Sequence, residues 1–194
     1  CLLCHEELKN PKGVVLCTTG IEHASSQSGK RCIDCHMTAG GQKTHAFRGA
    51  RNSDILKEAV ELNTARNGAS LLVSMKNISS HKFPTGNPAR SVILSVEFKK
   101  GNEVVETKRE VLNAQFLDGE GKPTLAPFSV EAGRDSRLNP DEKREYSFSI
   151  PEGATVASVK VLYRLMPEPL ADKLQIGDEA LKRTYPVIAR ELAL

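Results

Sequence analysis

The sequence contains no tryptophan, and aromatic residues make up only 5% of its 194 residues. No uninterrupted apolar stretch approaches the roughly 18 residues that a membrane-spanning helix needs, so we expect no membrane span. The formal net charge of +3 is small, and the basic residues are scattered among acidic ones. A nucleic-acid-binding protein would gather its basic residues on one face, so we expect no nucleic-acid partner.

The short motifs of several enzyme classes are also missing. The sequence has no G-x-G-x-x-G fingerprint, no P-loop and no G-x-S-x-G elbow, which rules out the common nucleotide-binding and hydrolase signatures. Cysteine is absent after residue 35, whereas a disulfide framework distributes its bridges through the fold. With 39% hydrophobic and 26% charged residues, the composition is that of a globular protein. The N-terminal fifth of the chain therefore has a chemical task of its own.

Two similar pentads lie in that N-terminal fifth, CLLCH at 1–5 and CIDCH at 32–36. C-x-x-C-H is the attachment signature of c-type haem. The two thiols bond to the two vinyl groups of the porphyrin, and the histidine that follows ligates the iron from the proximal side. We therefore predict two haem c groups, one held by Cys1, Cys4 and His5 and the other by Cys32, Cys35 and His36.

Two alternatives would use the same thiols. One is a zinc site of the form C-x-x-C…C-x-x-C, but Cys4 and Cys32 are farther apart than in a usual zinc ribbon, and zinc gives no reason for the two histidines. The other is a redox-active disulfide in each pair. Residues 1–50 hold few large apolar side chains for an independent core, and two bound porphyrins would supply the missing apolar bulk. Haem is the interpretation that we prefer.

Three histidines remain outside the pentads: His23, His45 and His81. Two irons that each have histidine on both axial positions would need two of these three, and each of the three has a plain structural or surface role as its alternative. After His81 come Phe83, Pro84 and Gly86, a stiff turn that can hold an imidazole in one orientation. The third histidine would be a bystander, or would ligate a haem of a missing N-terminal segment or of a neighbouring copy.

Three smaller features complete the N-terminal region. Cys17 is the odd cysteine, which we interpret as buried and inert, with iron ligation or an intermolecular disulfide as the alternatives. Met37 is a weak candidate for an axial ligand, because its neighbour His36 already holds that iron. The chain begins at Cys1 with no room for a secretory signal, so we expect it to be a processed or trimmed form.

The period of the apolar residues changes after the haem-binding region. Residues 52–68 have the pattern of an amphipathic connecting helix, with Ser53 as N-cap and Gly68 as its end. From there on, apolar residues alternate in the segments 71–77, 91–100, 103–112, 145–150 and 157–165, and Gly101-Asn102 is placed as a hairpin turn. This pattern predicts an antiparallel, Ig-like β-sandwich.

The remaining segments are harder to classify. The stretch 113–140 is interpreted as an exposed arm or as a loop with one short strand, and the proline-marked tail as short helices. The expected fold class is α+β, with a haem-bound N-terminal region of little regular structure, the sandwich and a short helical C-terminal tail. The expected division is 1–67 for the dihaem-binding region with its connecting helix, 68–166 for the sandwich and 167–194 for the tail.

The sequence resembles multihaem c-type cytochromes in the CxxCHM form of the second pentad, in THAFRG around His45 and in HKFPTGNPAR at 81–90. In that family a haem-bearing N-terminal part runs into a β-sandwich that begins near an H-x-x-P-T-G turn. The resemblance covers residues 1–165 and implies bis-His, low-spin haems for electron transfer outside the cytoplasm of bacteria or archaea. It implies His45 and His81 as distal-ligand candidates, and His23 matches a histidine often found ahead of CxxCHM. Some similar cytochromes polymerise into extracellular conducting filaments.

We therefore predict a dihaem electron carrier, with no catalytic residue of its own, whose partners are other redox proteins or neighbouring copies in a homo-oligomer or filament. Thioether formation takes place after export, so the expected location is periplasmic or extracellular. The alternative function is that of a redox enzyme, a peroxidase or a nitrogen- or sulfur-oxide reductase. Such an enzyme needs one iron with an open distal position, and three spare histidines for two irons argue against it.

Overall fold

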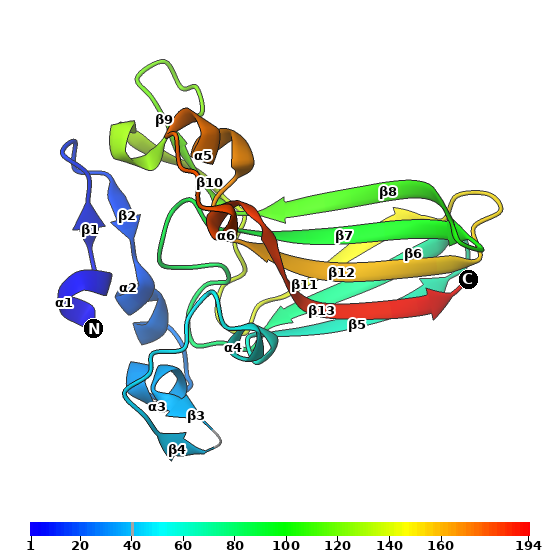
Figure 1. Cartoon of the computed structure of the whole chain (residues 1–194), viewed down its shortest axis with the longest axis horizontal. Coiled ribbons are helices and arrows are strands. Elements are labelled where there is room, and N and C mark those ends of the chain that lie inside the picture. Colours follow the sequence, from blue (N-terminus) through cyan, green and yellow to red (C-terminus); the bar gives the residue numbers. More distant parts are fainter. Residues whose placement is uncertain (40) are drawn as a thin grey trace.

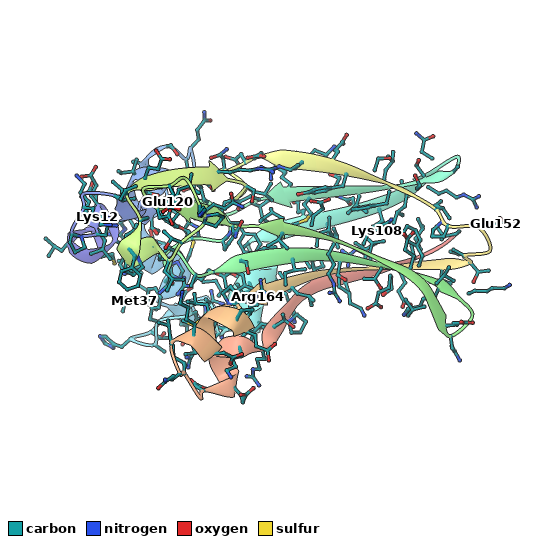
Figure 2. All side chains as sticks on the ribbon, turned by 90° about the horizontal axis from the view of Figure 1, so that it is seen from above. Lys12, Met37, Lys108, Glu120, Glu152 and Arg164 are labelled. Atoms are coloured by element: carbon teal, nitrogen blue, oxygen red, sulfur yellow. The ribbon has the colours of Figure 1, made fainter. Side chains whose placement is uncertain are left out.

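The computed structural model describes residues 1–39 and 41–194 and is shown in Figure 1. An N-terminal segment of short helices and very short strands lies at one end of a larger body of long strands. Figure 2 shows Lys12 and Met37 at the end that holds this segment and Glu152 at the opposite end. The predicted α+β class, with a small irregular N-terminal region and an antiparallel sandwich, is confirmed.

The sandwich consists of two antiparallel sheets. One has four strands in the order β13-β12-β7-β8, and the other has three in the order β11-β6-β5. Inward-facing side chains of both sheets form one apolar core, in which Val73 and Val159 are completely buried. The strands are β5 (Val60–Asn67), β6 (Ser70–Asn77), β7 (Ser91–Lys100), β8 (Glu103–Leu112), β11 (Lys143–Ser149), β12 (Val156–Arg164) and β13 (Thr184–Ala193).

The predicted hairpin between residues 91 and 112 is confirmed. Strands β7 and β8 pair antiparallel, with Lys100 opposite Glu103, so Gly101 and Asn102 form the two-residue loop. Gly101 has φ of +60°, a conformation that glycine adopts without the steric cost that a Cβ would bring.

The predicted connecting helix over 52–68 is wrong beyond its first turn. Helix α4 covers only Ser53–Lys57, and the side chain of Asn52, not that of Ser53, caps it by accepting from two backbone amides. The chain then enters strand β5, where Val60 and Leu62 alternate into the core. Pairing along the whole of β6 supplies the backbone hydrogen bonds that a helix would otherwise make, so this tertiary contact overrides the local helical pattern.

The C-terminal tail is only partly helical. It contains two short helices, α5 (Glu168–Lys173) and α6 (Glu179–Lys182), as predicted. The last ten-residue element is strand β13, which pairs along β12 at the edge of the four-stranded sheet. The sandwich therefore includes β5 and β13, two strands from segments that the sequence analysis had placed outside it.

The stretch 113–140 forms a docking platform for the N-terminal segment. It holds the hairpin strands β9 (Ala114–Leu117) and β10 (Glu131–Asp135) and a 3-10 turn, η1 (Ala126–Phe128), where the sequence had predicted one short strand at most. The buried amide of Asn10 donates to the carbonyls of Ala126 and Ser129, at 3.1 and 2.9 Å. Val14 and Phe116 are buried against each other in a small second core. These contacts fix the N-terminal segment on the sandwich.

The N-terminal segment itself has little core. Of its described side chains, only a few such as Val14 and Cys17 are buried, whereas Leu2, Leu3, Leu8, Ile21 and Phe47 are exposed. Among the described residues, no helix has the length and apolar character to cross a bilayer. The elements are α1 (Leu2–His5), β1 (Leu8–Lys9), β2 (Val15–Cys17), α2 (Thr19–Ala24), α3 (Cys32–His36), β3 (Thr38–Ala39) and β4 (Gln42–Lys43).

Candidate haem-binding site

Each pentad forms one short helical turn. In the first pentad the backbone amide of His5 donates to the carbonyl of Cys1 at 3.0 Å. The second pentad, Cys32–His36, forms the whole of α3. Residues three and four apart share a face of a helix, so such a turn places two thiols and a following imidazole together. Cys1 is exposed and Cys32 and Cys35 are partly exposed, while the side chain of Cys4 lies outside what the structure describes.

The second pentad has a built N-terminal cap. The carboxylate of Asp34 accepts from the backbone amide of Arg31 at 2.9 Å and from two guanidinium nitrogens of the same residue at 3.1 and 3.2 Å. These hydrogen bonds lower the pKa of Asp34 to about 2, so the carboxylate is charged at neutral pH. The cap holds the turn that carries Cys32 and His36.

His36 is oriented for ligation by its Nε2. Its Nδ1 lies 2.6 Å from the backbone carbonyl of Arg48, and a carbonyl can only accept, so Nδ1 is the donor and the lone pair of the neutral imidazole is on Nε2. The ring stacks on Phe47, with the centroids 4.6 Å apart and the planes 7° from parallel. A carbonyl behind the ring and an aromatic side chain beside it are typical supports of a metal-ligating histidine.

His81 comes from the other part of the molecule, the loop between β6 and β7. Its Nδ1 donates to the carbonyl of Lys82 at 3.0 Å, which again leaves Nε2 free. Burial lowers the pKa of this imidazole, although the hydrogen bond to the Lys82 carbonyl opposes the shift. Its own backbone carbonyl accepts from the amide of Asn77 at 2.7 Å. His81 is therefore a neutral imidazole on an anchored loop, which is the form that ligates metals.

The imidazoles of His36 and His81 lie near each other. Their ring centroids are 6.1 Å apart and their planes are 15° from parallel. The separation is too long for direct face-to-face contact of the rings. Two imidazoles that ligate one metal from opposite sides, with metal–nitrogen bonds of about 2 Å, have their centroids about 6 Å apart. The structure thus brings one predicted proximal ligand and one predicted distal ligand to the separation that shared ligation needs.

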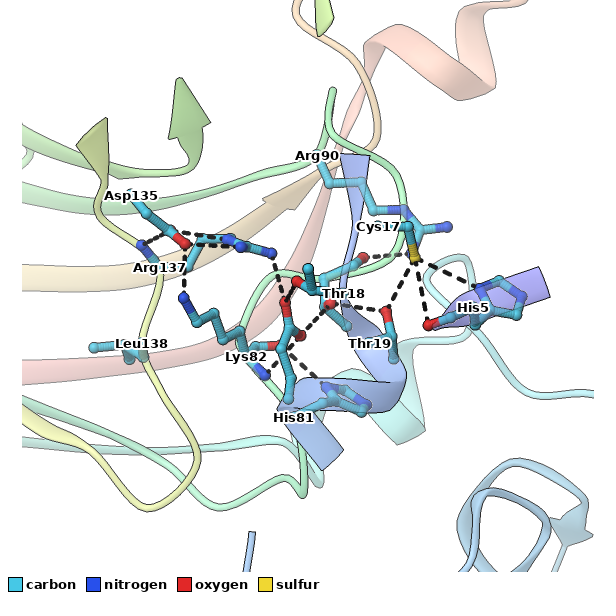
Figure 3. A network of polar contacts seen from close by, with 12 residues as sticks. His5, Cys17, Thr18, Thr19, His81, Lys82, Arg90, Asp135, Arg137 and Leu138 are labelled. Atoms are coloured by element: carbon cyan, nitrogen blue, oxygen red, sulfur yellow. Dashed lines mark hydrogen bonds and ion pairs between the residues drawn. The ribbon is translucent and has the colours of Figure 1, made fainter. Parts of the chain in front are cut away.

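The surroundings of His5 are different. His5 is exposed, and its Nδ1 lies 3.9 Å from the sulfur of Cys17, which is buried and also contacts the hydroxyl of Thr19 at 3.5 Å (Figure 3). Helix α1 packs on α2 at Gly20, where an added Cβ would come within 2.7 Å of Leu2. The buried position of Cys17 agrees with the interpretation of this residue as a structural side chain.

The other two histidines are not brought to either pentad histidine by a described ring contact. His23, on α2, is partly exposed, and its Nε2 donates to the carbonyl of Lys30 at 2.7 Å. His45 is exposed in the segment between β4 and α4. Among the described side chains, no group of three or more His, Cys, Asp or Glu lies close enough to bind a bare metal ion.

Two observations on the described residues are compatible with a large, partly anionic cofactor such as haem. Several large apolar side chains of the N-terminal segment are exposed, among them Leu3, which is fully exposed, and Phe47, which is 64% exposed. A porphyrin bound there would cover such side chains. Beside His36, the buried Nε of Arg48 has no hydrogen-bond partner within the described residues, so an acidic group bound there would satisfy it.

Sequence reasoning missed several residues that position these histidines. Arg48 links the segment after β4 to the second pentad, because its Nη2 donates to the carbonyl of Cys35 at 3.1 Å while its Nη1 pairs with Glu58. Asn77 and Glu22 anchor the loop of His81. Asn77 ends a predicted strand just before His81 and was the only one of the three with a local signal.

Comparison with solved structures gives an informative match. No known family model and no curated protein matches the sequence. The chain superimposes on a penta-haem cytochrome c552 from Thermochromatium tepidum with a TM-score of 0.89 and 28% sequence identity, over 100% of this chain and 55% of that one. The chain has a multihaem c-type cytochrome-like fold.

The chain spans about half the length of that cytochrome, since 55% of the latter is covered. A protein described as ApaA from Bordetella pertussis aligns with 70% of this chain and 89% of its own at 16% identity, but its TM-score of 0.30 carries no argument. The predicted resemblance to multihaem cytochromes is therefore supported at the level of the fold. The number of haems and the ligand assignments stay predictions.

Proposed function

We propose that this chain is a dihaem c-type cytochrome that carries electrons through haems with histidine on both axial positions. Cys1 and Cys4 would attach one haem and Cys32 and Cys35 the other, with His5 and His36 as the proximal ligands. Bound haem supplies a one-electron couple between ferrous and ferric iron, and the ligands and burial around it set the potential. The fold match to a multihaem cytochrome supports this proposal.

The observation that carries the proposal is the His36–His81 pair, with its centroid separation of 6.1 Å and an interplanar angle of 15°. We assign His81 as the second ligand of the iron that His36 holds. Both rings turn a hydrogen-bonded Nδ1 away toward a backbone carbonyl, which leaves each Nε2 for the metal. An iron closed on both sides by imidazole exchanges electrons without coordinating a substrate, which favours a carrier over an enzyme.

For the iron of the first pentad, His23 and His45 are the remaining candidates within the chain. The Nε2 of His23 is engaged with the Lys30 carbonyl, whereas His45 is exposed. An exposed imidazole is accessible to a neighbouring copy or to another redox protein, so the prediction of a homo-oligomer or filament depends on His45. We also propose a periplasmic or extracellular location, because haem is attached to C-x-x-C-H after export.

The cofactor content is tested by mass and absorbance. Two covalently attached haems add about 1.2 kDa to the polypeptide of 21.2 kDa, and the purified protein should show the Soret and α bands of ferrous haem c once it is reduced with dithionite. A colourless protein, or one that contains zinc instead of iron, contradicts the proposal. Carbon monoxide bound by one iron of the reduced, native wild type would favour the redox-enzyme alternative.

The ligand pair is tested by His81→Ala. Loss of the imidazole should leave one of the two irons five-coordinate, so the reduced variant should bind about one carbon monoxide per protein where the wild type binds none at that iron. Ser80→Ala is the matched control, because it changes the same loop and keeps the imidazole. If His81→Ala retains a fully low-spin spectrum and does not bind carbon monoxide, the assignment of His81 is wrong.

A further inference from the structure

Glu22 is a buried acid in the N-terminal segment whose side chain reaches the sandwich. It lies on α2, between the two pentads, and its side chain is only 4% exposed. Thr18, the residue just before α2, donates to its Oε1 at 2.6 Å. The backbone amide of Lys82 and the hydroxyl of Thr85 donate to its Oε2 at 3.1 and 2.6 Å, and Arg137 donates to Oε1 at 3.0 Å. Figure 3 labels three of these donor residues, Thr18, Lys82 and Arg137.

The ion pair with Arg137 is part of a closed network. Arg137 binds Asp135 through two contacts, Nε to Oδ1 at 2.9 Å and Nη2 to Oδ2 at 2.7 Å. Asp135 in turn accepts from the ammonium of Lys82 at 2.7 Å. Two carboxylates and two cations balance each other. A buried carboxylate is destabilising unless it is paired and hydrogen-bonded. The carboxylate of Glu22 therefore stays buried only while its hydrogen-bond partners stay in place.

The loop partners of Glu22 closely follow the residue that we assign as an axial ligand. Lys82 directly follows His81, and its backbone amide is the group that Glu22 binds. Asn77 holds the His81 carbonyl, which belongs to the same peptide unit as that amide. A carboxylate from the haem-binding segment and an amide from the sandwich therefore hold the two polar groups of the peptide unit that joins His81 to Lys82.

We infer that Glu22 is a positioning residue that locks the loop of His81 against the haem-binding segment and so keeps His81 at its distance from His36. This inference rests on the proposed ligation by that pair. Without the carboxylate, the Lys82 amide loses its partner, the Thr85 hydroxyl keeps only its contact with Thr19, and Arg137 loses its contact with α2. The loop is then held to the haem-binding segment less firmly, and His81 leaves the iron more readily.

The test compares Glu22→Ala and Glu22→Gln with Glu152→Gln in the full-length, haem-loaded protein. Glu152 is an exposed acid at the opposite end of the molecule (Figure 2), so its substitution controls for the loss of one carboxylate. We expect Glu22→Ala to raise the rate at which the reduced protein binds carbon monoxide at least about tenfold over the wild type, because hydrogen bonds to a charged group are lost. Glu22→Gln keeps the shape and an acceptor oxygen, so it should fall between the alanine variant and the wild type.

Covalent haem content by intact mass and far-UV circular dichroism establish that each variant is folded and loaded, and the reduction potentials are recorded alongside. The inference is overturned if Glu22→Ala stays as closed to carbon monoxide as Glu152→Gln, or if it loses structure and haem without opening an iron. His81→Ala distinguishes an error in the role of Glu22 from an error in the ligand pair. If His81→Ala opens an iron and Glu22→Ala does not, only the role of Glu22 is wrong. If neither opens one, the ligand pair is wrong and the inference fails with it.

Discussion

Replacement of Asn77 tests how the sandwich holds the loop of His81. The Asn77 side chain is completely buried at the end of β6. Its Nδ2 faces the carbonyls of His81, Leu138 and Asn139 at 2.7, 3.1 and 3.0 Å. Its Oδ1 accepts from the backbone amide and the hydroxyl of Ser79, at 2.9 and 2.7 Å. This one amide therefore connects the loop after β6 to the segment before β11.

The cost of Asn77→Ala follows from these contacts. The two N–H groups of the amide and the two bonds to its oxygen are lost together, and at about 1 kcal/mol net for each the free energy of unfolding should fall by about 4 kcal/mol. Asn77→Asp should cost about 1–2 kcal/mol more at neutral pH, because it places a carboxylate against three carbonyl oxygens. A typical domain is stable by about 5–15 kcal/mol, so either change removes a large share.

Urea unfolding followed by far-UV circular dichroism measures this loss. Asn102→Ala is the control, since Asn102 is exposed in the β7–β8 turn and its replacement should stay within about 0.5 kcal/mol of the wild type. If Asn77→Ala also stays within about 1 kcal/mol of the wild type, or if Asn77→Asp is the milder of the two variants, the contacts of this amide do not hold the loop as argued.

Two further predictions concern Cys17 and Asp135. Cys17→Ala should leave the haem mass and the low-spin spectrum unchanged, because the buried sulfur contacts His5 at 3.9 Å as a structural neighbour. If the variant loses haem or its low-spin spectrum, Cys17 ligates an iron instead. Burial disfavours the charge of Asp135, but hydrogen bonds from Arg137 and Lys82 outweigh it and lower the pKa of this carboxyl. A lowered folded pKa means that the pairing stabilises the protein above the ordinary carboxyl pKa and that this contribution is lost as the pH falls through the folded value. Asp135→Asn should therefore lower the urea midpoint more at about pH 7 than at about pH 3, and an equal effect at both would contradict the pairing.

The local geometry of the pentads and of the sandwich strands was predictable from the sequence. Each pentad is a single helical turn, so its geometry depends on residues that are adjacent in the sequence. The sandwich strands were equally accessible, because an alternation such as Val92, Leu94, Val96 and Phe98 has only one face that can enter a core.

Residues 60–67 show where local patterns fail. Val60 and Leu62 fit the apolar stripe of a helix that begins at Ser53, and they fit the inward face of a strand equally well. Gly68 follows them with φ of +59°, a value that suits the first position of a two-residue hairpin loop as well as the end of a helix. Only the pairing of β5 with β6, a tertiary contact, decides between the two.

The residues that position the ligands carried still less local signal. Glu22 and Arg137 are separated by 115 positions, and each stands in a run of polar residues that reads as a solvated surface. The same holds for His36 and His81, which were both candidates but could not be paired from the sequence. The ion pair of Glu22 with Arg137 is recognised by its burial, and the His36–His81 pair by the geometry of the two rings. Both are properties of the folded chain.

The division of the proposed ligand pair between two parts of the molecule has a physical consequence. The sandwich has a complete apolar core of its own, and it carries the loop of His81 with it. The N-terminal segment has few buried side chains and exposes several apolar ones, so it depends on its docking contacts through Asn10 and Glu22 and on whatever covers its apolar surface. Because His36 belongs to the segment and His81 to the sandwich, any loosening of the docking separates the two imidazoles. Under the proposed ligation, the contacts that hold the two parts together and the coordination of that iron would therefore stabilise each other.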